Sequence, residues 1–282
     1  MFKSLMHPIW AFDLEWVPDP HAGRLVYNLP DTLPDEDVLQ EMWNQAGADE
    51  ENPRPYLKTI LCRVVSVAAV TRDKNKEGKI ALDLRYFPKD PDVPMPEQAL
   101  IANFLKTVGK LKPQLVGFNS SESDLPILLQ RGVAQGVSAP DFCERPDKPW
   151  EGVDYFSQFG DYHIDLRKVL GSWGKATPSL HELAQVSGIP GKMDTSGSNV
   201  VDLWVAQKMR NIVEYNQYDA LTTYLVWLRV AYFAGHFNFK QYQAEQDLVK
   251  QLIKNKIKEG ESHLTKYLER WEQLKNEITR QV

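Results

Sequence analysis

The amino-acid sequence predicts an α/β domain built on a mixed sheet flanked by helices. Apolar or alternating runs typical of strands lie at residues 9–15, 60–71 and 79–87, and segments with apolar residues at helical spacing follow them. Three strands, a helix, a strand, a helix, a strand and then further helices succeed one another. This order of elements favours a sheet covered by helices.

The N-terminal part combines a buried strand with an acidic insertion. Residues 9–15 are mostly apolar and end in acids, as expected for a central strand whose C-terminal end carries polar chemistry. Residues 18–55 form an insertion, in which positions 31–52 hold eight acidic residues and no Lys or Arg. Prolines at 30, 34, 53 and 55 flank that stretch, and we expect a helix around 38–45.

The middle of the chain alternates strands and helices. Residues 60–71 and 79–87 predict a hairpin, and residues 138–160, rich in Pro and aromatic residues, predict a second insertion. The remaining expected elements are a helix at 96–111, a strand at 114–118, a helix from 123, a strand entering 163–170, and helices at 179–187, 200–209 and 212–231.

The C-terminal part predicts a helical tail. Residues 1–239 are expected to form the main domain, and residues 240–282 two charged helices broken at Gly260. The two helices could pair as a hairpin that packs on the main domain, or they could bind a protein partner.

Composition narrows the class of protein. The 282 residues include 33 Lys+Arg against 38 Asp+Glu, a formal net charge of -5, so any binding of nucleic acid must be local rather than driven by a positive field. Two cysteines are too few for a disulfide framework. No apolar run is long enough for a signal peptide or a membrane span, and we expect a cytoplasmic protein without a membrane partner.

The triplet Asp13-Leu14-Glu15 ends the first expected strand. Side chains at i and i+2 of a strand face the same way, so both carboxylates project together and Leu14 faces the opposite side. Such triplets also arise by chance in a chain with 38 acidic residues. In a central strand, however, two neighbouring carboxylates call for a cation between them.

A second group of polar residues follows the strand at 114–118. Phe118 and Asn119 end that strand, and Asp124 opens the next helix. Asp124 could be an acid that only complements the helix dipole. Gly117 and Asn119 instead favour a cleft at the strand end.

A third group lies on the long helix. Tyr215 and Asp219 are four residues apart, so they share one helix face and can address one site. The residues after Asp219 are apolar on most sides of the helix, so this carboxylate needs a partner, and a metal ion would serve. Between these groups, Lys192 lies in a Gly/Pro loop that is ordinary connecting structure, although its amine could contact a phosphate.

Taken in order, these motifs resemble the DEDD 3′–5′ exonuclease superfamily in its tyrosine-bearing branch. The segments FDLE, LVGFNSSESDLPILLQR, HIDL and YNQYDALTTYLVWLR are similar, more specifically, to bacterial exonucleases related to the proofreading domain of family B DNA polymerases. The similarity runs from about residue 9 to residue 228. It implies a ribonuclease H-like fold and hydrolysis of phosphodiester bonds at the 3′ end of nucleic acid.

The resemblance also implies roles for the motif residues. Asp13, Glu15 and Asp219 would hold one of two Mg²⁺ or Mn²⁺ ions, and Asp13 would bridge to the second with Asp124 nearby. Hard cations of this kind prefer oxygen ligands. Tyr215 would orient the attacking water, and nucleoside 5′-monophosphates would be released. Leu14, Phe118, Asn119 and Lys192 are candidate contacts to the substrate.

The expected substrate is a single-stranded 3′ end, with DNA favoured over RNA. Phe118, Tyr155, Phe156 and Phe159 are candidate surfaces on which bases stack, although such loop aromatics more often serve packing. Ser123 departs from the family pattern, which has an aromatic residue just before the second-motif Asp. The alternative is a non-catalytic nucleic-acid-binding or scaffolding protein that recruits partners through its helical tail.

Overall fold

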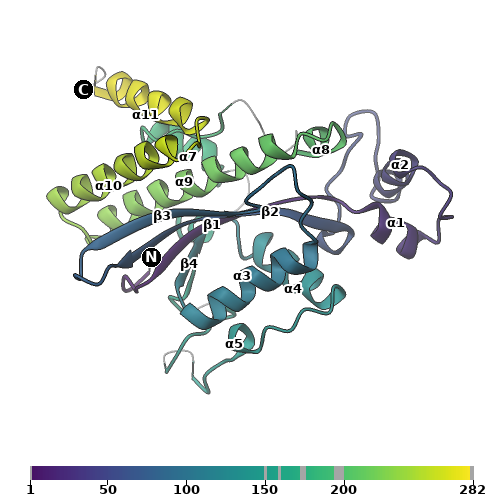
Figure 1. The fold of residues 1–282 in the computed structure, drawn as a ribbon, viewed down its shortest axis with the longest axis horizontal. Helices are drawn as coiled ribbons and strands as arrows, with labels where there is room; N and C mark the ends of the chain where they lie inside the picture. Colours follow the sequence, from purple (N-terminus) through teal and green to yellow (C-terminus); the bar gives the residue numbers. More distant parts are fainter. Residues whose placement is uncertain (1, 149–150, 158–159, 172–175, 194–199, 280–282) are drawn as a thin grey trace.

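The computed structural model describes residues 2–279 except 149–150, 158–159, 172–175 and 194–199. A five-stranded sheet in the order β3-β2-β1-β4-β5 lies at its centre (Figure 1). β2 is antiparallel to both β1 and β3, whereas β4 is parallel to both β1 and β5. The mixed sheet predicted from the sequence is therefore confirmed. The strands are β1 (Ile9–Pro18), β2 (Cys62–Lys74), β3 (Ile80–Phe87), β4 (Gln114–Gly117) and β5 (His163–Asp165).

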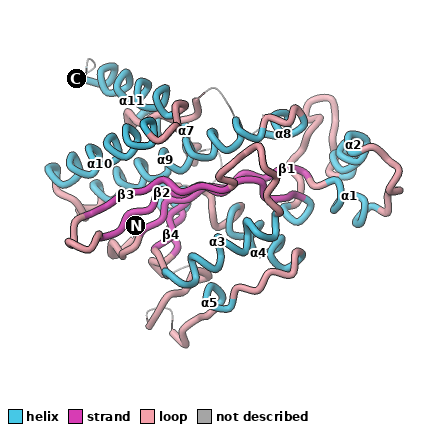
Figure 2. The backbone as a smooth tube through the Cα atoms, in the orientation of Figure 1, coloured by secondary structure: helices cyan, strands magenta, loops and turns pink. Residues whose placement is uncertain are grey.

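Helices cover both faces of this sheet (Figures 1 and 2). One layer consists of α3 (Glu97–Leu111), α4 (Asp124–Ala134) and the short α5 (Pro140–Cys143). The opposite layer contains α7 (Leu180–Val186), α9 (Met209–Phe233), α10 (Phe239–Lys258) and α11 (Leu264–Thr279). Two further short helices are α6 (Leu166–Leu170) and α8 (Val200–Val205). Among the described residues, no helix combines the length and the apolar character that crossing a bilayer requires.

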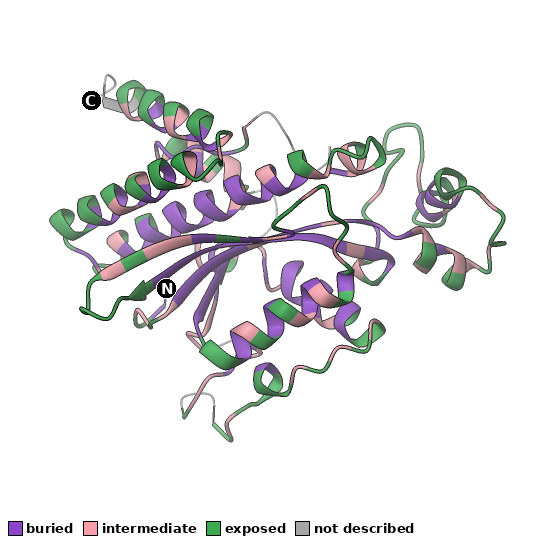
Figure 3. Cartoon of the chain, viewed as in Figure 1, coloured by how far each residue is buried: buried purple, intermediate pink, exposed green. Residues whose placement is uncertain are grey.

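The alternation of side chains along β1 separates two hydrophobic cores. Ile9 and Ala11 pack into the core beneath α9, whereas Trp10, Phe12 and Leu14 pack into the core formed with α3 and α4. Figure 3 shows the resulting pattern: most of β1, β2 and α9 is buried, β3 is only partly buried, and the outer faces of the other helices are exposed. β1 therefore lies between two packed layers, which keeps its backbone in a fixed position.

The insertion at residues 18–55 holds two helices where the sequence predicted one. The expected helix is α2 (Asp35–Gln45), and α1 (Pro20–Tyr27) precedes it. The Asp19 side chain accepts a hydrogen bond from the His21 amide at the N-terminus of α1, and Asn28 ends that helix with a φ of 52°. Gly23 is the only buried residue of α1, so this eight-residue helix lies at the surface and contributes little to the core.

The C-terminal helices α10 and α11 pack on α9 and share its core (Figure 1). A buried ion pair joins them to the sheet: Nη2 of Arg72 on β2 lies 2.5 Å from Oε1 of Glu245 on α10. The Tyr224 hydroxyl donates a further hydrogen bond of 3.1 Å to Glu245. Gly260 separates the two helices with a φ of +114°, a conformation that favours glycine.

We expect Glu245→Ala to lower the free energy of unfolding by about 3–5 kcal/mol, because it leaves the Arg72 guanidinium buried without its carboxylate. Urea denaturation followed by circular dichroism measures this change. Glu77→Ala removes the exposed Lys79 ion pair and serves as the control, with an expected change of at most about 0.5 kcal/mol. Equal effects of the two substitutions would show that the tail is not anchored through this pair.

Candidate metal-binding active site

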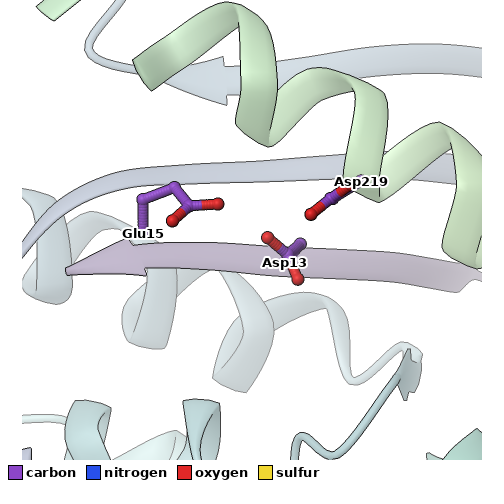
Figure 4. Close-up of side chains that lie close together, drawn as sticks. All are labelled: Asp13, Glu15 and Asp219. Atoms are coloured by element: carbon purple, nitrogen blue, oxygen red, sulfur yellow. The ribbon is translucent and has the colours of Figure 1, made fainter. Parts of the chain in front are cut away.

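Three carboxylates converge between the central strand and the long helix. Asp13 and Glu15 project from β1 toward α9, which carries Asp219, and each side chain offers an oxygen within 4.8 Å of the other two (Figure 4). The two-residue spacing on β1 puts both acids on the face that Ile9 and Ala11 also use. A β-bulge in the pairing with β2 follows directly after Glu15, where such irregularities re-aim side chains.

Tyr215 lies one helical turn before Asp219 on the same face of α9, as the four-residue spacing predicts. Its hydroxyl donates a hydrogen bond to the Asp219 carboxylate, and only 4% of the residue is exposed. Burial, followed by the charges of Asp219, Glu15 and Asp13, raises the pKa of the Tyr215 phenol. The phenol therefore remains a protonated hydrogen-bond donor at neutral pH.

Asp124 approaches the same place from the opposite layer of helices. It opens α4, is 4% exposed, and accepts a hydrogen bond of 2.8 Å from the Ser123 hydroxyl. β4 pairs with β1 only as far as Ala11, and beyond that point the backbone N–H of Leu14 donates to the Asp124 carboxylate. The end of the β4 pairing thus gives a residue of α4 access to β1.

A buried ionic network holds α4 in this position. Arg131 lies two turns after Asp124, and its Nε donates to Glu97 of α3 over 2.9 Å. Its Nη2 donates to Asp19 over 2.6 Å, and its Nη1 to the carbonyl of Ile60 over 3.0 Å. One guanidinium therefore connects α4 to α3, to the start of the insertion and to the segment before β2.

Burial raises the pKa values of all four acids at this site, and mutual repulsion adds to this effect for two of them. Burial, and next the charge of Asp219, raises the pKa of Asp13 and of Glu15 well above ordinary values. Burial also raises the pKa of Asp124 to about 7 and that of Asp219 to about 6. A divalent cation would compensate these charges, and the donor set consists of the carboxylate oxygens that Mg²⁺ and Mn²⁺ prefer. The residues present therefore fit a metal site.

Asn216 is a site residue that the sequence analysis did not assign, although it lies inside the Tyr215–Asp219 motif. It is fully buried; its Nδ2 donates to the Asp13 carboxylate over 2.8 Å, and its Oδ1 accepts from the Ser66 hydroxyl over 2.9 Å. The sequence held one signal for this role, because Asn216 is a polar residue on a helix that is buried on nearly all sides. Asn216 orients Asp13 by fixing one of its oxygens.

Asp165 at the end of β5 is a second residue that the motifs did not single out. Its carboxylate accepts hydrogen bonds from the backbone amides of Asn119 (2.9 Å), Ser121 (3.0 Å) and Arg167 (3.0 Å). It therefore holds the turn between β4 and α4 and caps α6 at the same time. Within that turn Asn119 adopts a φ of 64°, and its Oδ1 accepts from Nη1 of Arg167 over 2.6 Å.

A pocket of about 390 Å³ opens beside the carboxylates. It contains two of the predicted substrate contacts, Phe118 and Asn119. The complete lining is Asp13, Trp16, Tyr56, Phe118, Asn119, Glu122, Ser123 and Asp124.

The other predicted contacts have different positions. The Leu14 side chain is 2% exposed and packs in the core, so only its backbone faces the site. Lys192 is exposed, and its charge lowers the pKa of Glu15 and Asp219, so it lies within electrostatic range of the cluster. Tyr155 is 3% exposed and stacks on Phe142, and Phe156 packs edge-on against the same ring.

Tyr155 and Phe156 were candidate stacking surfaces with packing as the more common alternative, and in the structure both rings pack within the second insertion. Phe159 lies outside the described residues. Ser123, which departs from the family pattern, is 8% exposed, and its hydroxyl bridges the Asn119 carbonyl and the Asp124 carboxylate over 2.8 Å each. At this position the hydroxyl orients Asp124 by hydrogen bonding.

A family profile described as "Predicted 3'-5' exonuclease related to the exonuclease domain of PolB" matches residues 54–271. The chain belongs to this family. The match contains Asp124, Tyr215 and Asp219, begins after Asp13 and Glu15, and extends into the helical tail as far as residue 271. The mixed sheet with helices on both faces is consistent with the ribonuclease H-like fold expected of such an exonuclease.

One solved structure similar to this PolB-related exonuclease is the family B DNA polymerase of the hyperthermophilic archaeon Pyrobaculum calidifontis. The sequences are 18% identical, the TM-score is 0.49, and the alignment covers 81% of this chain and 25% of the polymerase. The chain thus spans about a quarter of the length of that protein. No curated protein matches the chain.

We expect the metal-free protein to lose stability as pH rises from about 4 to 7, and Asp219→Asn to flatten this loss. The raised pKa values of Asp124 and Asp219 mean that the native state binds more protons than the unfolded state in this range, so the free energy of unfolding falls as pH rises. Urea denaturation in EDTA at several pH values measures it. Asp31→Asn, on the exposed insertion, is the control and should retain the wild-type slope.

Proposed function

We propose that this PolB-related exonuclease removes nucleotides from the 3′ end of single-stranded nucleic acid, with DNA favoured, by a two-metal-ion mechanism. The observation that carries the proposal is the convergence of Asp13, Glu15 and Asp219, with oxygens within 4.8 Å of one another, next to a pocket that also contains Asp124. Glu15 is buried and Asp13 and Asp219 are half-buried, so their mutual repulsion is only partly screened by water and a cation would compensate it.

The carboxylates would hold the ions. Asp13, Glu15 and Asp219 would bind one, and Asp13 and Asp124, which both line the pocket, would bind the second. Bound divalent ions stabilise the negative charge that develops on the attacking and leaving oxygens of a phosphodiester. Asn216 would keep the Asp13 carboxylate in its binding orientation through its 2.8 Å hydrogen bond.

Tyr215 would orient the attacking water. Its pKa is raised, so the phenol acts as a hydrogen-bond donor and not as a base. The Tyr215 hydroxyl donates a hydrogen bond to the Asp219 carboxylate, so it lies beside the three clustered acids. Attack at the phosphorus followed by departure of the 3′ oxygen of the preceding nucleotide releases a nucleoside 5′-monophosphate.

The net negative charge of the chain favours contact with only a short segment of the nucleic acid. The chain has a formal net charge of -5, so a long duplex would gain little electrostatic attraction. Lys192, whose charge acts on Glu15 and Asp219, and Arg167, which donates to Asn119 in the pocket lining, are the basic residues near the site that would make a few phosphate contacts.

We expect stepwise shortening of single-stranded DNA from the 3′ end, in Mg²⁺ or Mn²⁺ and not in EDTA. Oligonucleotides of DNA and RNA labelled at either end, separated on denaturing gels, distinguish the direction of cleavage and the preferred sugar. Absence of cleavage with every metal would contradict the proposal and would favour a binding protein without catalytic activity.

We expect Asp13→Asn and Asp219→Asn to lower kcat by at least about 1,000-fold and Tyr215→Phe by roughly 10- to 100-fold, because the tyrosine only positions a reactant. Cleavage rates under single-turnover conditions measure the effect of each of the three substitutions. Asp73→Asn, an exposed acid at the far end of β2, is the matched control and should cleave at the wild-type rate. Wild-type activity of Asp219→Asn would exclude this site as the place of catalysis.

A further inference from the structure

A second pocket of about 670 Å³ adjoins the one beside the carboxylates. Tyr56 and Glu122 line both pockets, so the two pockets meet at these side chains, and together they are called the groove. The remaining lining of the second pocket is Lys58, Thr59, Ile60, Pro126 and Gln130. Its lining combines an aromatic ring and two apolar side chains with a few polar groups and one amine, in a shallow depression that is open to solvent.

The aromatic ring at the junction is unusually exposed. Tyr56 is 70% exposed and Ile60 is 37% exposed, and both line this pocket. An exposed aromatic ring offers a face on which a base can stack. Tyr155 and Phe156 pack within the second insertion. Trp16 and Phe118 are half-buried in the lining of the first pocket, so Tyr56 is the most exposed aromatic ring lining the two pockets.

The segment around Tyr56 is anchored on both sides. Leu57 is 5% exposed and packs in the core. Arg54 forms a 2.6 Å ion pair with Asp202 of α8, and its guanidinium lies 5.0 Å from the ring centre of Trp43 on α2. The acidic insertion therefore holds this tyrosine at the mouth of the pocket.

Hydrogen bonds also hold the rest of the second pocket's lining in place. The Thr59 hydroxyl donates to Gln130 of α4 over 2.7 Å, and the Ile60 carbonyl accepts from Arg131. The acidic charge of Glu122 is offset by Arg167, at 3.5 Å, and by Lys168, at 3.9 Å. A polyanionic strand can therefore pass Glu122 without facing an unpaired carboxylate.

We infer that this second pocket receives the nucleotide preceding the 3′-terminal one, with its base stacked on Tyr56 and a phosphate near Lys58. This inference rests on the proposed function, because it assumes that the terminal nucleotide occupies the pocket beside the carboxylates. A base stacked outside a duplex must be unpaired, so the groove selects 3′ ends with at least two unpaired nucleotides.

Stacking on Tyr56 is tested by fluorescence rather than by activity. Single-stranded DNA carries 2-aminopurine, a base analogue whose emission falls on stacking, either next to the 3′-terminal nucleotide or far from the 3′ end. It is titrated with wild-type protein in Ca²⁺, and gels verify that the DNA stays intact. We expect quenching only at the penultimate position, its loss in Tyr56→Ala together with roughly tenfold weaker binding, and its retention in Tyr56→Phe.

Two further variants sharpen the result. Phe233→Ala removes another highly exposed aromatic ring, 78% exposed at the end of α9, and should leave quenching and affinity unchanged. Lys58→Ala should reduce the slope of log Kd against log salt concentration by about 0.7, the contribution of one phosphate of a single strand.

Parallel cleavage assays in Mg²⁺ separate this inference from the proposed function. If wild-type protein degrades DNA from the 3′ end while Tyr56→Ala keeps both quenching and affinity, the second pocket is not a nucleotide site and the exonuclease proposal stands. If wild-type protein neither binds nor degrades the DNA, both are overturned.

Discussion

Mutual repulsion of clustered carboxylates, of which Glu15 is buried and Asp13 and Asp219 are half-buried, is the constraint on which the rest of the site depends. Asp13, Glu15 and Asp219 would separate if their backbones could move, since each gains hydration and loses repulsion by doing so. They remain together because β1 lies between two packed cores and α9 is buried over most of its length. The free energy that holds the acids near one another comes from hydrophobic packing elsewhere in the fold.

Buried and half-buried hydrogen bonds and ion pairs hold the acidic side chains in place on this packed scaffold. Asn216 links Asp13 to Ser66 of β2, and Arg131 ties the helix of Asp124 to α3 and to the insertion. Asp165 holds the turn through which the chain passes from β4 to α4. Each is a buried or half-buried hydrogen-bonding group acting on an element that carries an acid, so each preserves the spacing of the cluster.

The sequence predicted those features that depend on local periodicity. The alternation around Asp13 and Glu15 and the four-residue spacing of Tyr215 and Asp219 define faces of a strand and a helix, and the structure has both. It did not predict α1, which buries only Gly23, nor the roles of Asn216 and Asp165, whose partners lie 203 and 46 residues away along the chain. The packing of Tyr155 on Phe142 likewise depends on a tertiary contact that periodicity does not reveal.

Because α9 supplies both the core and Tyr215, Asn216 and Asp219, it leaves little freedom for engineering. A substitution on almost any of its faces either opens a cavity or disturbs a site residue. The helix is therefore a poor target for substitutions intended to change specificity. The segment from Arg54 to Ile60 is different, since it reaches the groove while lying mainly at the surface. Libraries directed at its exposed positions, such as Tyr56 and Lys58, change the lining of the second pocket and leave the buried residues of β1 and α9 unaltered.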